Sequence, residues 1–283
     1  MNGGDVGAGL VPACGFGQGQ ALRLQMACDG QGQDLRLQMA RDAQGQDLRL
    51  QMARDAHITA RDAQITARDA QIEGVHRQTD ASSPQVAVKI CGIRRPADAV
   101  VAAESGADFL GLMFWEGSRR RVTEDQARAI LDAVRGRVKV VGVFVNEAPA
   151  EMNRLARDLG LDYVQLSGDE PDTIVSVLDV PAIQVIHVRG PVAAERIDGC
   201  PADLVMLDAG RRGSYGGTGQ AFDWSLAPAV ERRVFLAGGL HAGNVGEAVA
   251  RVRPWGVDVS SGVEMAGEKD PALIREFIRV VRG

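Results

Sequence analysis

The chain has 283 residues, of which 45% are hydrophobic, and this is enough to bury one large core or two ordinary ones. A formal net charge of −5 at pH 7 disfavours nonspecific binding to nucleic acid or to an anionic membrane, because both favour a basic surface. An anionic substrate is still compatible with this charge, since backbone N–H groups can build a phosphate site locally.

Four cysteines are present, and their spacing fits neither a zinc site nor a disulfide scaffold: Cys14, Cys28, Cys91 and Cys200. We therefore expect reduced thiols. No apolar run approaches the roughly 20 residues that a membrane helix needs. The start of the chain lacks the basic segment and apolar segment of a signal peptide. These patterns predict a cytoplasmic protein.

Short repeats fill the first 85 residues. Leu-Arg-Leu-Gln-Met-Ala begins at Leu22, Leu35 and Leu48, and Ala-Arg-Asp-Ala recurs at Ala53, Ala60 and Ala67. The seven-residue unit carries one large apolar residue, whereas a coiled coil needs two. We therefore predict a low-complexity extension over residues 1–85, disordered or partly helical, and the alternative is a short oligomerising helix. Such repetition is also typical of expanded DNA repeats or of a start codon assigned too far upstream.

The sequence pattern changes at Val86, where short apolar runs begin to alternate with amphipathic helical stretches. We therefore assign residues 86–283 to one catalytic domain. Runs of this kind fit strands that are covered on both faces, as in a parallel sheet. There are eight of them: Val86–Ile90, Phe109–Phe114, Val138–Val145, Tyr163–Leu166, Ile183–Val188, Leu204–Leu207, Val234–Ala237 and Val257–Val259.

Helix signals separate several of these runs. Pro96 is typical of a first helical turn, and Thr123 with Gln126 predicts a capping box. Apolar residues at helical spacing follow at Ala127, Ile130, Leu131 and Val134, at Met152, Leu155, Ala156 and Leu159, and at Leu273, Ile274, Phe277 and Ile278 after Pro271. Shorter helices are expected near Pro171, Pro191 and Trp224.

Eight such βα units in about 198 residues predict an α/β protein of the closed (β/α)8 TIM-barrel type, at the small end of its range. A doubly wound open sheet is the competing architecture, but it usually has fewer strands. In a barrel the active site lies at the carboxyl ends of the strands. The residues that follow each strand therefore carry the functional argument.

Glycines and serines follow the last strands, where barrels build phosphate sites. They are Gly238, Gly239, Ser260, Ser261 and Gly262, and a glycine-rich loop after the sixth strand adds Gly217 and Gly219. Glycine lets backbone N–H groups approach an anion closely. The alternative is that these glycines only form tight turns. The recurrence after two neighbouring strands favours a phosphorylated small-molecule substrate.

Cys91 and Asp208 end the first and sixth strands, across the predicted barrel mouth. Alone, Cys91 is typical of a buried structural thiol, and Asp208 fits a hydrogen-bonding role at the barrel rim as well as catalysis. Together, and without a histidine partner, they favour acid/base proton transfer. One residue of the run Arg119 to Arg121 is expected to bind a second anionic group, and the others to be surface residues.

Several motifs occur in order along residues 86–283, and together they resemble phosphoribosylanthranilate isomerase. They are Lys89-Ile90-Cys91-Gly92-Ile93, Gly142-Val143-Phe144-Val145-Asn146, Gly216-Gly217-Thr218-Gly219, Phe222-Asp223-Trp224 and Asp258-Val259-Ser260-Ser261-Gly262-Val263-Glu264. The resemblance implies a cofactor-free Amadori rearrangement in tryptophan biosynthesis, which turns N-(5′-phosphoribosyl)anthranilate into 1-(2-carboxyphenylamino)-1-deoxyribulose 5-phosphate.

The resemblance also implies roles for single residues. Asp208 matches the general acid that opens the ribose ring, and Cys91 matches the general base that removes the C2′ proton. Arg120 matches the residue that binds the anthranilate carboxylate, Asp258 matches a position near the sugar hydroxyls, and Gln165 joins the substrate-binding set. These roles require a lowered pKa for Cys91 and a raised pKa for Asp208. Ser167 departs from the family, where histidine is common.

Three other functions are compatible with parts of this sequence. A histidine-pathway isomerase or a bifunctional relative would use a carboxylate as base in place of Cys91. Indole-glycerol-phosphate synthase needs a catalytic lysine at the strand ends. Lys89 is a candidate, because it shares the inward face of its strand with Cys91, but no second candidate lysine is expected at the barrel mouth. A third reading is an inactive barrel that serves as a binding scaffold. The expected assembly is a monomer or a homodimer, with neither nucleic acid nor membrane as a partner.

Overall fold

The computed structural model describes residues 85–209 and 222–283. Its strands are β1 (Ala87–Cys91), β2 (Phe109–Met113), β3 (Lys139–Phe144), β4 (Tyr163–Leu166), β5 (Ala182–His187), β6 (Leu204–Asp208), β7 (Val234–Leu236), β8 (Gly256–Val259), β9 (Glu264–Met265) and β10 (Glu268–Lys269). Its helices are α2 (Pro96–Glu104), α3 (Glu124–Val134), α4 (Pro149–Leu159), η1 (Asp172–Val177), α5 (Ala194–Asp198), η2 (Trp224–Leu226), α6 (Val245–Val252), η3 (Ser261–Val263) and α7 (Pro271–Arg282).

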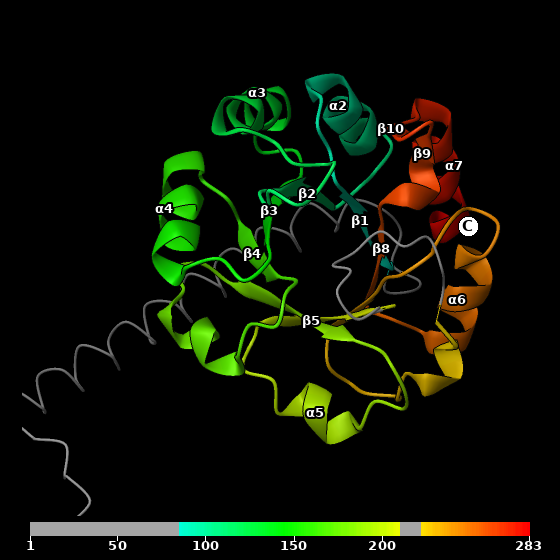
Figure 1. Cartoon of the computed structure of the whole chain (residues 1–283). Helices are drawn as coiled ribbons and strands as arrows, with labels where there is room; N and C mark the ends of the chain where they lie inside the picture. Colours follow the sequence, from blue (N-terminus) through cyan, green and yellow to red (C-terminus); the bar gives the residue numbers. More distant parts are fainter. Residues whose placement is uncertain (1–84, 210–221) are drawn as a thin grey trace, which may run out of the picture. The chain divides into compact units, whose positions relative to one another are not determined.

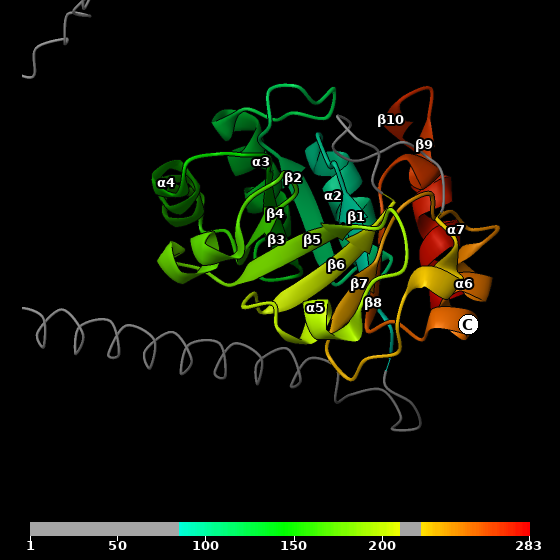
Figure 2. The ribbon, with the colours of Figure 1, turned by 60° about the horizontal axis from the view of Figure 1, so that its bottom comes forward.

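Strands β1 to β8 pair in sequence order, and β8 pairs with β1 to close the barrel. Every pairing in this barrel is parallel, and the helices surround the ring of strands (Figure 1). Figure 2 presents the strands from the side, where they run alongside one another. The prediction of a (β/α)8 TIM barrel is confirmed. Each of the eight predicted runs coincides with a strand, and no end differs by more than one residue.

The helix starts that the sequence predicts at Pro96 and Thr123 are confirmed. Helix α2 begins at Pro96, and the capping box of α3 forms in full, with Thr123 and Gln126 each accepting a backbone N–H of the other. Helix α6 was absent from the sequence-based prediction. Its apolar residues do recur at helical spacing, and Val245 and Ala248 are buried against the barrel.

Two apolar layers stabilise the barrel. The larger layer lies between the strands and the surrounding helices, and the smaller one fills the barrel interior. At the amino-terminal end of the interior, Phe109, Phe235 and Trp255 pack edge to face with ring centroids 5.1–6.0 Å apart. Both faces of each strand are covered, and this explains why the strands are nearly continuous apolar runs in the sequence.

An aspartate recurs one residue before β2, β4 and β6. Asp108, Asp162 and Asp203 accept the backbone N–H of Val88, Val140 and Ala182, respectively, at 2.7–2.9 Å. Each carboxylate therefore ties the start of its own strand to the start of the preceding one. Before β8 the backbone takes over this role, since the Trp255 carbonyl accepts the Ala87 N–H at 3.0 Å. These bonds lie at the end of the barrel that is opposite the active site, where polar residues serve stability.

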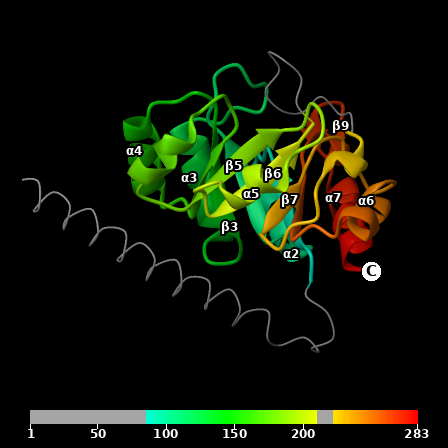
Figure 3. The same cartoon turned by 90° about the horizontal axis from the view of Figure 1, so that it is seen from below.

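The hairpin formed by β9 and β10 lies at the other end of the barrel from the carboxyl terminus of α7 (Figure 3). Within the described residues, the helices lack the combination of length and apolar character that crossing a membrane requires. The extension predicted for residues 1–85 lies outside the described residues except for Gln85. The boundary between extension and catalytic domain therefore stays a prediction.

We expect Asp162→Ala to lower the free energy of unfolding by about 1–3 kcal/mol, because the Val140 N–H is left without its acceptor. Asp162→Asn retains an oxygen that can accept this hydrogen bond, so its loss should be smaller. Urea unfolding followed by circular dichroism measures both. Equal losses in the two variants would show that the tie between strands is not what Asp162 contributes.

Candidate active site

A cavity of about 330 Å³ opens at the carboxyl ends of the strands. The predicted site residues that line it come from four strands, β1, β4, β6 and β8, and from the segments that follow β2, β7 and β8. These are Cys91, Arg120, Gln165, Asp208, Gly238, Gly239, Asp258, Ser260 and Ser261. The structure therefore brings the proposed acid, the proposed base and three proposed binding regions to one pocket.

Three predicted phosphate-binding residues are not among the described residues that line this cavity. Gly217 and Gly219 lie outside the described residues. Gly262 is not among the residues that line the cavity. The backbone carbonyl of Leu240 occupies the space where a Cβ of residue 262 would lie. Gly262 thus permits close packing between the turn after β8 and the loop after β7. Its backbone N–H remains a proposed phosphate donor only.

Sequence reasoning missed other lining residues, among them Met113, Trp115, His187 and Met206. Except for Trp115, they lie on the inward faces of their strands, two residues from other interior positions. His187 ends β5 and pairs in register with Asp208 on β6. The alternation of side chains along each predicted strand could have identified these inward residues, because every second side chain faces the same way.

Cys91 is 7% exposed and ends the inward row of β1. Burial raises the pKa of its thiol, whereas the nearby ammonium of Lys89 lowers it and the carboxylate of Asp258 raises it. The net direction is upward. The sequence-based expectation of a lowered pKa is therefore wrong for the site without substrate, because desolvation of the thiolate outweighs the attraction of the cations around it.

Asp208 ends β6 on the facing side of the pocket. Burial raises the pKa of its carboxyl group, the negative charge of Asp258 raises it further, and the neighbouring His187 lowers it. The expected direction is confirmed. A carboxyl group in this setting keeps its proton at a higher pH than an exposed aspartate does, and this is what a general acid needs.

Lys89 lies deeper in the barrel, is 0% exposed and does not line the cavity. Its Nζ donates to Asp258 Oδ1 at 2.7 Å. A second lysine, Lys269, reaches the same end of the barrel, where its Nζ donates to the Ser260 carbonyl and to Glu264 at 2.8 Å. No lysine is among the described residues that line the cavity, which agrees with the expectation that no second lysine is a catalytic candidate there. Lys269 is also nearly buried and lies outside the cavity lining.

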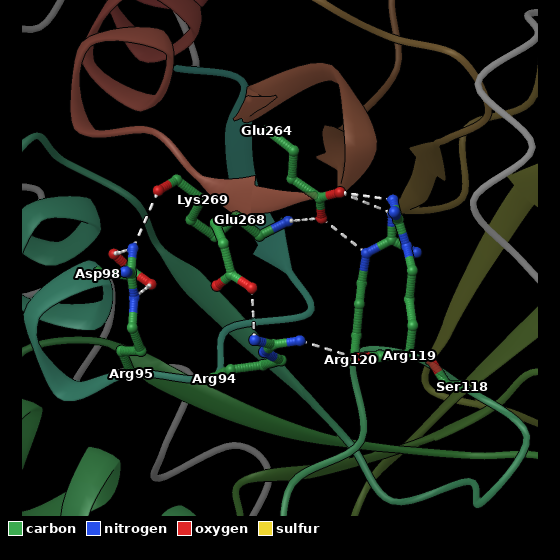
Figure 4. Close-up of polar contacts among 9 residues, drawn as sticks. All are labelled: Arg94, Arg95, Asp98, Ser118, Arg119, Arg120, Glu264, Glu268 and Lys269. Carbon is green, nitrogen blue, oxygen red and sulfur yellow. Dashed lines mark hydrogen bonds and ion pairs between the residues drawn. The ribbon is translucent and has the colours of Figure 1, made fainter. Parts of the chain in front are cut away.

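The structure distinguishes the three consecutive arginines after β2. Arg120 is 9% exposed, lines the cavity and is held by Glu264 through Nε at 2.6 Å and Nη2 at 2.9 Å (Figure 4). Arg119 is largely exposed and donates to the same carboxylate at 2.8 Å. Arg121 forms an exposed pair with Glu116. The Glu264 bonds fix the plane of the Arg120 guanidinium and leave Nη1 to donate to another group.

The Glu264 carboxylate binds more than one cation. Its Oε1 also accepts from Lys269 of the same hairpin, as Figure 4 shows. Arg119 and Arg120 bind this carboxylate from the loop after β2 and so join that loop to the hairpin after β8. Burial raises the pKa of Glu264, but the hydrogen bond from Arg120 and the charge of Lys269 more than offset this and lower it. Glu264 therefore stays ionised and anchors Arg120.

Gln165, on β4, donates through Nε2 to the Ser167 hydroxyl at 2.9 Å. Its Oε1 is buried and has no hydrogen-bond partner among the described residues. His187 Nε2 lies 3.2 Å from the Ser167 carbonyl. The serine at position 167 thus orients the Gln165 amide, whose oxygen is an acceptor for a hydroxyl or an N–H of a ligand.

Gly238 follows β7 and combines two constraints. Its φ of +84° is a left-handed conformation that favours glycine. A Cβ at this position would also lie 2.6 Å from the Ala209 Cβ and 3.1 Å from Asp208 Oδ1. Glycine therefore allows the loop after β7 to pass directly over the carboxyl group at the end of β6.

No cluster of three or more histidine, cysteine, aspartate or glutamate side chains that could hold a metal ion occurs in residues 85–209 and 222–283.

The comparisons with known proteins agree on one family. The profile of the PRAI family, described as N-(5′phosphoribosyl)anthranilate (PRA) isomerase, matches residues 88–280. The N-(5′-phosphoribosyl)anthranilate isomerase of Pelobacter propionicus is 42% identical over 200 residues, which cover 70% of this chain and 96% of that protein.

Solved structures of the same family resemble this chain. The phosphoribosyl anthranilate isomerase of Thermus thermophilus superposes with a TM-score of 0.64 at 38% identity, covering 69% of this chain and 98% of that one. A second isomerase structure, in complex with reduced 1-(o-carboxyphenylamino)-1-deoxyribulose 5-phosphate, has a TM-score of 0.59 at 33% identity and covers 70% and 98%. The chain therefore belongs to the N-(5′-phosphoribosyl)anthranilate isomerase family, whose reaction on a phosphorylated small molecule is a step of tryptophan biosynthesis.

Proposed function

We propose that Cys91 and Asp208 are the general base and general acid of the Amadori rearrangement of N-(5′-phosphoribosyl)anthranilate. The observation that carries this proposal is their convergence on one cavity from β1 and β6, between Arg120 on one side and the Gly238–Gly239 turn on another. A thiol and a carboxyl group so arranged can serve two proton transfers on a single sugar.

The chemistry divides into two proton transfers. Asp208 donates a proton to the ribose ring oxygen as the bond from this oxygen to C1′ breaks, and the aniline nitrogen supplies the electron pair that forms the Schiff base. Cys91 then removes the proton from C2′, which gives an enolamine. The enolamine becomes the ketone when a proton is gained at C1′ and another is lost from the C2′ hydroxyl. The atoms of substrate and product are the same, as an isomerisation requires.

The two anionic ends of the substrate have separate partners in this proposal. Arg120 binds the anthranilate carboxylate, and its pairing with Glu264 holds the guanidinium in place before the substrate arrives. Backbone N–H groups at Gly238, Gly239, Ser260 and Ser261 bind the phosphate, with Gly217, Gly219 and Gly262 as further donors. Asp258 and the Oε1 atom of Gln165 are proposed partners of the sugar hydroxyls and of the bridging N–H.

The proposed setting is that of a cytoplasmic enzyme that acts as a monomer or homodimer. The net charge of −5 supports a small-molecule substrate over a nucleic acid or a membrane as partner. The proposed residues and the substrate supply every atom and proton of the two steps, so the proposal includes no cofactor.

We expect Cys91→Ser and Asp208→Asn each to lower kcat by about 10²–10⁴-fold with little change in KM, because each removes one proton transfer and leaves the binding groups in place. Steady-state assays that follow the loss of substrate fluorescence measure this. In the native enzyme kcat/KM should follow a bell-shaped pH profile, since activity requires Asp208 protonated and Cys91 ionised.

Cys200→Ala is the matched control for the thiol. Cys200 is buried on the outer side of the barrel and does not line the cavity, so its removal should leave turnover near that of the native enzyme. Turnover close to native in either Cys91→Ser or Asp208→Asn would rule out the assigned role of that residue.

Arg120→Lys should raise KM by about tenfold or more and change kcat less, because an ammonium cannot make the planar paired contact with both Glu264 and a carboxylate. The neighbouring Arg121→Lys is the control, since Arg121 is exposed and pairs with Glu116. Equal effects of the two substitutions on KM would contradict the role given to Arg120.

Gly238→Ala should lower kcat by at least about tenfold, because the added methyl group would push against Asp208 and Ala209. Gly160→Ala provides the same backbone strain without the crowding: φ at Gly160 is +70°, and nothing lies within 4 Å of a Cβ there. Both variants should lose stability on thermal unfolding, but only Gly238→Ala should lose activity. A fully active Gly238→Ala enzyme would contradict the close packing over Asp208.

A further inference from the structure

Lys89 has no part in the steps above, although it is a fully buried charged residue in the barrel interior. It lies two residues before Cys91 on β1, so both side chains face inward. Its Nζ donates to Asp258 on the neighbouring strand β8 at 2.7 Å. A lysine in such a place keeps its charge only if a partner compensates for the loss of water.

Gly111, on the neighbouring strand β2, reveals how close the lysine and the cysteine come. A Cβ at position 111 would lie 2.8 Å from Cys91 Sγ and 3.1 Å from Lys89 Nζ. Sulfur and nitrogen therefore converge on a space that exists because position 111 has no side chain. Nζ thus contacts the carboxylate of Asp258 and lies near the thiol of Cys91.

We propose that Lys89 is a positioning residue whose buried ammonium group, anchored by Asp258, stabilises the thiolate of Cys91. The inference rests on the proposed function of Cys91 as general base. Lys89 does not line the cavity and so does not touch the substrate; it acts through the sulfur.

The charges around the thiol support this role. Burial raises the pKa of Cys91, and among the charged neighbours the largest effect is the lowering by Lys89, followed by the opposing effect of Asp258 and the lowering by Lys269. The Arg120 guanidinium also interacts with Cys91, and Asp208 faces it across the cavity. Lys89 is therefore the cation that does most to offset the cost of forming a buried thiolate.

The anchor keeps the lysine charged. Burial lowers the pKa of Lys89, but the attractions of Asp258 and Cys91 more than offset this, and the pKa lies above its ordinary value. The charged form of Lys89 is thus favoured despite its burial. A role confined to filling the barrel interior would differ, because an apolar side chain of similar length could replace the lysine without changing the thiol.

The test is the pH dependence with which iodoacetamide alkylates Cys91 in the full chain without substrate, followed by peptide mass mapping. In Lys89→Met we expect the midpoint of this curve to move to higher pH by at least about one unit, which means about tenfold less thiolate at a given lower pH. The midpoint is the readout rather than the rate, since a thiol of higher pKa is also a stronger nucleophile.

Two controls guard the result. Cys200, mapped in the same samples, should keep its own alkylation curve in every variant, because it lies outside the barrel interior. Lys139→Met removes a partly buried lysine at the start of β3 that is also paired with an aspartate, Asp162 at 3.1 Å, and should leave the Cys91 midpoint where it is. Circular dichroism at each pH identifies unfolding.

Lys89→Met leaves Asp258 buried without its partner, which lowers the stability of this variant. The double variant Lys89→Met with Asp258→Asn removes both charges. Its Cys91 midpoint should still move upward, because the lowering effect of Lys89 is larger than the raising effect of Asp258. An unchanged or lower midpoint in whichever of these variants folds overturns the proposal.

Kinetics separate this inference from the proposed function. In Lys89→Met, kcat/KM near neutral pH should fall by up to about tenfold for each unit by which the thiol pKa rises, because less thiolate is present and its greater basicity compensates only in part. If Cys91→Ser were fully active, the role of Cys91 as base would be lost, yet the alkylation curve would still report whether Lys89 stabilises the thiolate. If Cys91→Ser were inactive and the alkylation midpoint in Lys89→Met were unchanged, only the inference about Lys89 would be lost.

Discussion

Closure of eight parallel strands into a barrel directs every second side chain toward a shared interior, and the rest of the site depends on this constraint. At the amino-terminal end the interior is filled by aromatic rings. At the carboxyl end the inward positions carry Cys91, Asp208 and Asp258, which thereby face one cavity although they are far apart in the sequence. The proposed catalytic groups need no flexible loop to bring them together, because the strands already hold them.

The same burial has opposite consequences for the two proposed catalytic groups. It raises the pKa of Asp208, which helps an acid keep its proton, and it raises the pKa of Cys91, which hinders a base from losing one. The barrel offsets this cost by placing a buried ammonium group beside the thiol. Lys89 and its anchor Asp258 are in this view part of the electrostatic setting of the reaction, rather than a stabilising ion pair alone, since such pairs contribute little net stability.

Much of this arrangement could be predicted from the sequence, because strand periodicity and capping signals are local. The eight strands, the capping box at Thr123 and the facing positions of Cys91 and Asp208 follow from such patterns. The pairing of Arg120 with Glu264 could not be predicted, since the two residues are 144 positions apart and meet only in the folded barrel. The direction of the Cys91 pKa was missed for a related reason: it is a balance between burial and several distant charges.

The most direct test of the central claim is the crystal structure of this enzyme with reduced 1-(o-carboxyphenylamino)-1-deoxyribulose 5-phosphate. We predict that the sulfur of Cys91 lies within about 4 Å of C2′, the distance of atomic contact. Asp208 should then lie beside the oxygen released from the ribose ring, and the phosphate should rest on the backbone between Gly238 and Ser261. A complex in which C2′ faces another basic group, such as His187, with Cys91 out of contact, would contradict the account.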